Sequence, residues 1–212
     1  MTGMLGEGFL VSLQIFLLTL VGSLPLGMLV AFARMSSFKP LALLARLYIS
    51  LMRGTPLMLQ MFAIYFVPYY VFGVSLTTDS KWQATIVAFI VNYAAYFAEI
   101  YRSGIQSIPR GQHEAAEVLG YSRTQTFVRI VLPQVVKRIM PSMTNEVITL
   151  VKDTSLAFSI GVIEMFTVAK QLVASQVSML PFAIAAAFYW IFNLLIDFIA
   201  GRIERKLSYY HD

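Results

Sequence analysis

The side chains best suited to chemistry lie in a stretch that is otherwise apolar. Between positions 141 and 168, five polar or charged residues fall within nine positions: Asn145, Glu146, Thr149, Lys152 and Asp153. At about 100° per residue, they share an arc of about 120° on one helical face. Because charged groups inside a membrane span are costly, such a face indicates a cavity or a pathway. Lys152 could bind a carboxylate of a solute, and Asp153 or Glu146 an ammonium group.

The alternative for this polar face is structural, namely ion pairs with Glu99 or Arg53 that hold subunits together. Lys152 and Asp153 are adjacent in the sequence, so they do not face each other well enough for a strong mutual pair. Glu99 also lies three residues before Arg102, which fits a helix-end ion pair as well as a gating role.

Four more polar side chains are candidates. Thr154 and Ser155 directly follow the polar face, and in a broken helix their hydroxyls could contact a solute or bond back to backbone carbonyls. Gln60 and Asn92 are amides in the middle of apolar stretches, where they could connect helices or contact a ligand.

Arg53 can be interpreted in two ways. Thr55 and Pro56 suit the N-cap and the first position of a new helix, which would leave Arg53 as an interfacial cation. If the helix from Leu41 is continuous, Arg53 lies about 18 Å along it at about 1.5 Å per residue, deep enough to face a site.

The composition indicates a membrane protein. Of the 212 residues, 58% are hydrophobic and 13% charged, whereas about a quarter of an ordinary soluble domain is charged. These values exclude intrinsic disorder, and the lack of cysteine excludes thiol catalysis and thiolate metal sites. The net charge of +5 does not indicate nucleic acid binding, which needs a basic face on a soluble body.

The apolar stretches predict an all-α membrane protein with five transmembrane helices. They cover Phe9–Ala33, Leu57–Phe72, Trp82–Tyr101, Pro141–Val168 and Pro181–Ala200. The first carries Ser23, Gly27 and Ala31 at four-residue spacing, which lets another helix approach closely.

The positions of the basic residues predict the orientation. Thirteen of the sixteen Lys and Arg residues lie in the segments 34–53 and 102–138 and in the tail 202–206. Since cytoplasmic loops retain Lys and Arg, we expect the N-terminus outside and the C-terminus in the cytoplasm.

A cytoplasmic loop separates the third and fourth spans, and we place it at residues 103–136 of a single domain, 1–212. Its segment Gln112–Gly120 is predicted to be a short helix. Pro109 and Gly111 interrupt the chain before it, and Gly120 can adopt the left-handed conformation that ends a helix.

A second helix is expected directly after it. Ser122 and Gln125 have the spacing of a capping box, and we expect this helix to end at Pro133. The short helix Gln112–Gly120 is unstable alone. Its small face at Ala115 and Ala116 must therefore dock in a cleft of another protein or on the membrane surface.

This loop resembles the EAA loop of ABC importer permeases in Glu114-Ala115-Ala116, Gly120, Ile130 and Leu132-Pro133. Further motifs are similar to the polar amino acid branch of that family: Arg53-Gly54-Thr55-Pro56, Ala95-Tyr96, Ala98-Glu99-Ile100, Arg102, Gly104-Ile105 and Lys152-Asp153-Thr154-Ser155-Leu156. The resemblance implies a coupling helix that sits in a groove of an ATPase subunit through Glu114, Ala115, Ala116, Leu119 and Gly120. The candidate pathway residues are Arg53, Thr55, Gln60, Asn92, Glu99, Asn145, Glu146, Thr149, Lys152, Asp153, Thr154 and Ser155.

The resemblance also implies partners and a location. It implies a multi-pass permease of the bacterial cytoplasmic (inner) membrane, in contact with lipid, that imports polar amino acids. A second permease copy or a homologue would complete the pathway, cytoplasmic ATP-binding subunits would bind ATP and Mg²⁺, and an extracytoplasmic amino acid-binding protein or domain would deliver substrate. No cofactor is expected in this chain, and no nucleic acid partner.

No catalytic or metal site is expected. The sequence has no Gly-rich nucleotide-binding loop ending in Gly-Lys-Ser/Thr, and His113 and His211 lack the spacing of a metal site or a triad. ATP hydrolysis therefore belongs to another chain. The alternative functions are a stand-alone secondary transporter or channel subunit, for which we find no internal repeat, and a membrane scaffold, which would not need the polar face.

Overall fold

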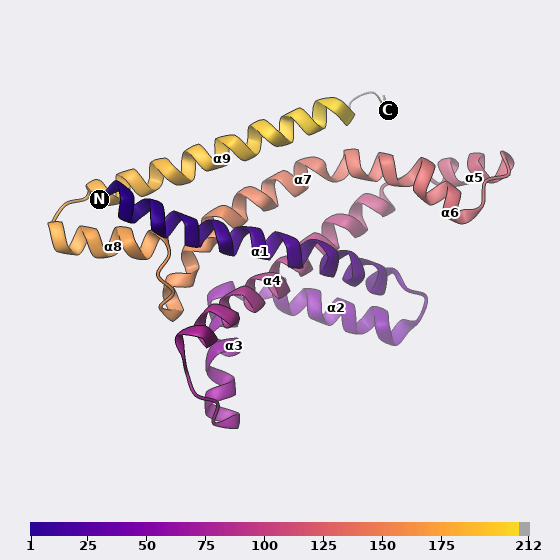
Figure 1. Ribbon diagram of the computed structural model, residues 1–212. Coiled ribbons are helices and arrows are strands. Elements are labelled where there is room, and N and C mark those ends of the chain that lie inside the picture. The colour runs from indigo at the N-terminus through magenta and orange to yellow at the C-terminus, as the bar shows by residue number, and fades with distance from the viewer. Residues whose placement is uncertain (208–212) are drawn as a thin grey trace.

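The described part of the protein is a bundle of α-helices. The computed structural model describes residues 1–207, in which no strand occurs. Figure 1 shows the long helices α1 (Thr2–Met35), α4 (Thr78–Gln106), α7 (Leu132–Asp153) and α9 (Leu180–Leu207). The shorter helices are α2 (Lys39–Gly54), α3 (Leu57–Phe72), α5 (Arg110–Val118), α6 (Arg123–Thr126) and α8 (Met165–Gln176). The all-α class is confirmed, and His211 lies outside the described residues.

Five candidate spans can be counted in these residues. The helices α1, α4 and α9 are each long and apolar enough to cross a membrane. Two bent helix pairs are further candidates, in which α2 meets α3 at 108° and the segment 123–160 meets α8 at 61°. With each bent pair counted as one span, the number agrees with the sequence-based expectation.

The close approach expected on the first span occurs between α1 and α4. Ser23 and Ala31 are fully buried, and Gly27 lies between them on the same face. A Cβ atom at Gly27 would lie 2.9 Å from Phe97 Cβ and 3.0 Å from the carbonyl oxygen of Ala94. The small residue therefore allows two backbones to pack almost in contact.

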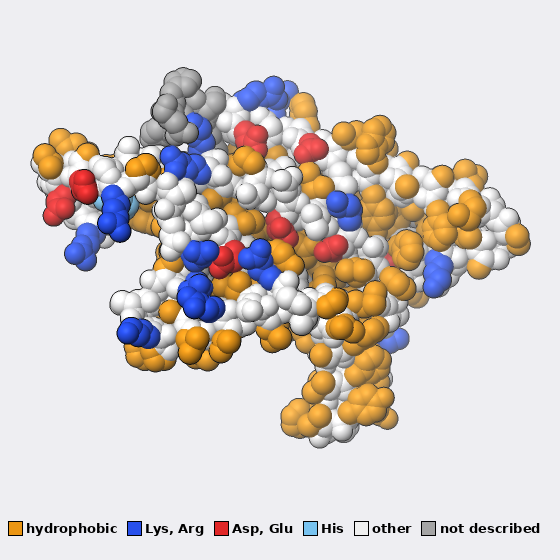
Figure 2. All heavy atoms as spheres, turned by 180° about the vertical axis from the view of Figure 1, so that it is seen from behind, with side chains coloured by type: hydrophobic (Ala, Val, Ile, Leu, Met, Phe, Trp, Pro, Cys, Tyr) orange, Lys and Arg blue, Asp and Glu red, His pale blue; other side chains and the backbone are white. Residues whose placement is uncertain are grey.

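The core lies around α4, whereas α9 packs at the edge of the bundle. Phe89, Tyr93 and Phe97 of α4 are buried almost completely. In α9, only 6% of the apolar window is buried, and Trp190 and Phe198 are more than half exposed. Figure 2 shows hydrophobic side chains over much of the surface, while most Lys and Arg side chains gather toward the end that carries α5 and α6.

The fourth span is interrupted in its second half. After α7, the chain forms a 3₁₀-helix, Thr154–Ile160, and then turns at Gly161, whose φ of 80° is left-handed. Such a φ is strained for other residues, which explains a glycine here. Helix α8 then starts behind Glu164, whose side chain occupies the N-cap position.

The loop between α4 and α7 is nearly all helical. Gly120 has a φ of 78°, as expected for the end of the first short helix, and Ser122 and Gln125 form the expected capping box. The expectation that the second helix ends at Pro133 was wrong. A π-helical turn, Phe127–Val131, leads into α7, and Pro133 lies in the first turn of α7, where its missing N–H costs little.

Candidate functional site

The polar residues of the site begin at the break between α2 and α3. Helix α2 runs from Lys39 to Gly54, so the helix from Leu41 is continuous through Arg53, and a new helix begins after Pro56. Thr55 is not the N-cap, because Pro56 takes that position in an extended conformation. The Thr55 hydroxyl instead donates to the carbonyl of Leu51, 2.8 Å away and one turn back in α2.

Two buried amides connect the break to α4. Gln60 Nε2 donates to Thr55 Oγ1 at 2.8 Å and to the carbonyls of Met52 and Thr55 at 3.0 and 3.1 Å. Asn92 Nδ2 donates to Met52 O and to Gln60 Oε1, both at 3.0 Å. These bonds pair backbone carbonyls that lose their helical partners at the bend, which is how a membrane protein tolerates a break. These hydrogen bonds of both amides thus hold the helices together.

Arg53 projects from the last turn of α2 toward α4 and α7. Its guanidinium carbon lies 5.2 Å from the centre of the Tyr96 ring, a cation–π distance. It is also close enough to the carboxylates of Glu99 and Glu146 to interact electrostatically with both. The break therefore brings an exposed cation to acidic groups on two other helices.

The polar face of α7 meets α4 through a tyrosine that the sequence reasoning missed. Tyr93, which is 1% exposed, donates its hydroxyl to Asp153 Oδ2 at 2.7 Å. Glu146 is half-buried near the same two side chains, while Lys152 is exposed. The only signal in the sequence was the spacing of Tyr93 and Tyr96, which lie three apart and so share a helical face.

The hydroxyl groups along α7 and the 3₁₀-helix bond to their own backbone. Thr149 donates to Asn145 O at 2.9 Å, Thr154 to Val151 O at 2.7 Å and Ser155 to Lys152 O at 2.7 Å. This back-bonding pairs carbonyls where the helix tightens. Of the three hydroxyl groups, Thr154 is the buried one, with 1% of the residue exposed.

Glu99 and Arg102 form an ion pair at the end of α4. Arg102 Nη2 lies 2.7 Å from Glu99 Oε2, and its Nε donates to the same carboxylate. Both side chains are partly exposed. The helix-end pair expected from the i, i+3 spacing is therefore present, and a surface pair of this kind contributes at most about 1 kcal/mol.

The structure thus gathers part of the candidate set into one cluster from three helices. We call it the α2–α4–α7 cluster; its members are Arg53, Tyr93, Tyr96, Glu99, Glu146 and Asp153. A cation, carboxylates and tyrosines on three neighbouring helices can bind a solute that carries both an ammonium and a carboxylate group. Among residues 1–207, no group of three His, Asp or Glu side chains is placed to hold a metal ion.

The EAA segment lies apart from this cluster, at the end of the molecule formed by α5 and α6 (Figure 1). On α5, Ala116 is 1% exposed, while Glu114 and Ala115 are exposed. Leu119, just after the helix, is 73% exposed. Ala116 therefore attaches the short helix to the rest of the bundle, and the other positions lie on the surface.

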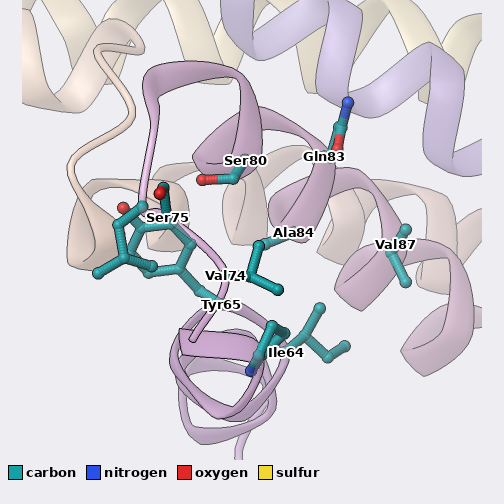
Figure 3. A pocket seen from close by; sticks show the side chains of 10 residues that line it. Ile64, Tyr65, Val74, Ser75, Ser80, Gln83, Ala84 and Val87 are labelled. Carbon is teal, nitrogen blue, oxygen red and sulfur yellow. The ribbon is translucent and has the colours of Figure 1, made fainter. Parts of the chain in front are cut away.

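A further hollow, of about 230 Å³, lies where α3 meets the start of α4 (Figure 3). Tyr65, Val74, Ser80 and Ala84 are among its lining residues. None of the candidate pathway residues lines it.

Comparison with known proteins decides the family. Residues 23–209 match the family described as binding-protein-dependent transport system inner membrane component. The chain belongs to this family. Members of the binding-protein-dependent transport family are permease subunits, so the chain is a transport subunit of an ABC importer and not an enzyme, as the EAA loop predicted.

Several members of the family are similar over almost the whole chain. The putative glutamine transport system permease of Rickettsia conorii is 37% identical over 203 residues, which are 95% of this chain and 91% of that protein. The L-cystine permease TcyB of Bacillus subtilis is 36% identical over 208 residues, 97% and 87% of the two chains. The arginine permease ArtQ of the same species is 37% identical over 203 residues, 95% and 91%.

Solved structures of ABC transporters share the fold. A crystal structure of an amino acid ABC transporter with histidines has a TM-score of 0.87 and 31% identity, over 97% of this chain and 94% of that chain. An inward-facing methionine transporter, MetNI, has a TM-score of 0.72 over 96% and 94% of the chains. Its identity of 20% supports the fold alone.

Proposed function

We propose that this chain imports polar amino acids and that the α2–α4–α7 cluster lines their pathway. The observation that carries the proposal is the convergence of Arg53, Glu146 and the Tyr93–Asp153 pair from three helices at the break of a span. An amino acid presents a carboxylate to a cation and an ammonium group to a carboxylate, which matches this set. Relatives named as putative glutamine, L-cystine and arginine permeases support the same substrate class.

The other candidate residues fall into two groups in this proposal, those on the surface of the pathway and those that support its backbone. Asn145, Thr149, Lys152 and Ser155 belong to the surface of α7 and the 3₁₀-helix along which the solute passes. Thr55, Gln60, Asn92 and Thr154 support the broken backbone of the pathway, in keeping with their hydrogen bonds.

Transport requires partners that contact other surfaces of the chain. A second copy or a homologue completes the pathway, and cytoplasmic ATP-binding subunits, which bind ATP and Mg²⁺, receive the exposed side of α5 at Glu114, Ala115, Leu119 and Gly120. An extracytoplasmic amino acid-binding protein or domain delivers the substrate. Lys and Arg side chains gather near α5 and α6 in Figure 2, which supports a cytoplasmic location for that end of the molecule. The chain would then cross the bacterial inner membrane with its N-terminus outside.

Reconstitution tests this function. The permease should co-purify with its ATP-binding subunit, and proteoliposomes should take up radiolabelled glutamine, arginine or cystine only with ATP and in a vanadate-sensitive way. Uptake by the permease without the ATP-binding subunit would instead support a stand-alone secondary transporter.

The coupling role of α5 has its own test. Ala115→Trp places a large side chain on the exposed face and should lower uptake about tenfold or more, the effect of about 1.4 kcal/mol in docking, while membrane insertion is unchanged. Ala115→Ser keeps the position small and serves as the control. Normal uptake by Ala115→Trp would count strongly against docking at α5.

A further inference from the structure

The second half of the fourth span is held at both ends by side chains of other helices. At its start, Asp153 accepts the hydroxyl of Tyr93 from α4. Near its end, Glu164 and α8 contact α1. The 3₁₀-helix Thr154–Ile160, which carries two pathway candidates, lies between these two attachments.

The attachment to α1 is built around a buried carboxylate. Glu164 is 0% exposed and accepts the backbone N–H groups of Phe166 and Thr167 at 2.7 and 2.8 Å, and the Thr167 hydroxyl at 2.9 Å. No salt bridge to Glu164 is found among the described residues. The N–H groups at the start of α8 and the Thr167 hydroxyl therefore supply the buried carboxyl group with hydrogen bonds.

Ser12 of α1 joins this arrangement from the other side. Its hydroxyl proton has two acceptors within reach, Glu164 Oε2 at 3.4 Å and the carbonyl oxygen of Gly8 in α1 itself at 3.3 Å, and its oxygen accepts from the Met165 nitrogen at 3.3 Å. One turn earlier in α1, a Cβ atom at Gly8 would lie only 2.8 Å from Met165 Cα, so the backbones are in contact. We call this arrangement of Gly8, Ser12, Glu164 and Met165 the α1–α8 latch.

The latch also adjoins the 3₁₀-helix directly. Ser12 and Thr154 line the same small cavity of about 10 Å³, together with Tyr189 of α9. A shift of Ser12 or of α8 would therefore reach the first residue of the 3₁₀-helix as well as its last.

We propose that Ser12 and Glu164 are positioning residues for transport, which hold the 3₁₀-helix against α1 while the ATP-binding subunits drive the conformational change. The inference rests on the proposed function, because the segment it positions belongs to the proposed pathway. A cap that served only the stability of α8 would not need the Ser12 bridge to α1.

Cysteine labelling tests the latch without any substrate. The chain has no cysteine, so a single Ser159→Cys reports on the 3₁₀-helix, where the Ser159 hydroxyl is buried. We expect Ser12→Ala or Glu164→Gln to raise the rate of maleimide labelling about threefold or more in the assembled transporter, because local opening becomes easier. Thr77→Ala, which removes the N-cap hydroxyl of α4 away from the break, is the matched control and should leave the rate unchanged.

Transport per ATP is the second measurement. In proteoliposomes supplied with labelled glutamine, arginine or cystine, Ser12→Ala and Glu164→Gln should lower the amount transported per ATP hydrolysed, and Thr77→Ala should not. Equal labelling in all backgrounds, or an equal rise in Thr77→Ala, would overturn the latch. Failure of the unmodified transporter to take up any of the three amino acids would count against the proposed function, and the labelling rates would still decide on the latch.

Discussion

The packing of α1 against α4 permits a quantitative prediction at Gly27. A methyl group there would lie 2.9 Å from Phe97 Cβ and 3.0 Å from the Ala94 carbonyl oxygen, and neither atom can rotate away. Overpacking of this kind costs about 1–3 kcal/mol. Alanine is favoured over glycine in a helix by about 1 kcal/mol, so Gly27→Ala should lower the free energy of unfolding by about 0–2 kcal/mol.

Gly6 offers a matched control in the same helix. No atom lies within 4 Å of a Cβ built there, so Gly6→Ala keeps the helical gain without the clash. The free energies of unfolding of the two variants should differ by about 1–3 kcal/mol, the overpacking cost alone. Reversible unfolding in mixed detergent micelles with increasing SDS measures this difference. A difference below about 0.5 kcal/mol, typical of surface substitutions, would refute the close approach of α1 and α4.

Three further predictions concern the break, the cluster and the loop. Asn92→Leu removes two hydrogen bonds at the α2–α3 bend. Each such bond contributes about 0.6 kcal/mol in a membrane, so the free energy of unfolding in the same SDS assay should fall by about 1 kcal/mol. An unchanged free energy would show that the bend does not need the Asn92 amide. Tyr93→Phe removes the hydrogen bond to Asp153 and should lower kcat/KM for uptake about 10- to 150-fold, because a hydrogen bond to a charged group is worth about 1.5–3 kcal/mol. Unchanged uptake kinetics would remove the pair from the pathway. Gly120→Ala places a side chain on a residue with a φ of 78°, and the resulting strain should shift α5 and lower uptake per ATP. Gly111→Ala, whose Cβ would have nothing within 4 Å, should leave uptake unchanged. Equal uptake by both variants would contradict a role of Gly120 in placing α5.

The sequence predicted the features that follow from local rules. Apolar length predicted the spans, and turn chemistry predicted the left-handed Gly120 and the capping box at Ser122. Small residues at four-residue spacing predicted the approach at Gly27. Each of these depends on residues close together in the chain, so one sequence suffices.

Features that depend on distant residues were not predictable in the same way. The Tyr93–Asp153 and Ser12–Glu164 contacts join residues 60 and 152 positions apart, and no local pattern specifies them. Pro133 was wrongly predicted to end a helix, because a proline fits both the first turn of a helix and the position after its last turn. The π-helical turn Phe127–Val131, which the sequence did not indicate, places Pro133 in the first turn of α7.

The sparse packing of α9 has a consequence for the order of assembly during synthesis. The most extensive helix–helix contact joins α1 and α4, and α3 also packs on α4, so the first half of the chain contains its own folding partners. Chains fold as they are made, with N-terminal parts first. The α1–α4 unit can therefore form before α9 leaves the ribosome, and α9 is added last, to a bundle that is already packed.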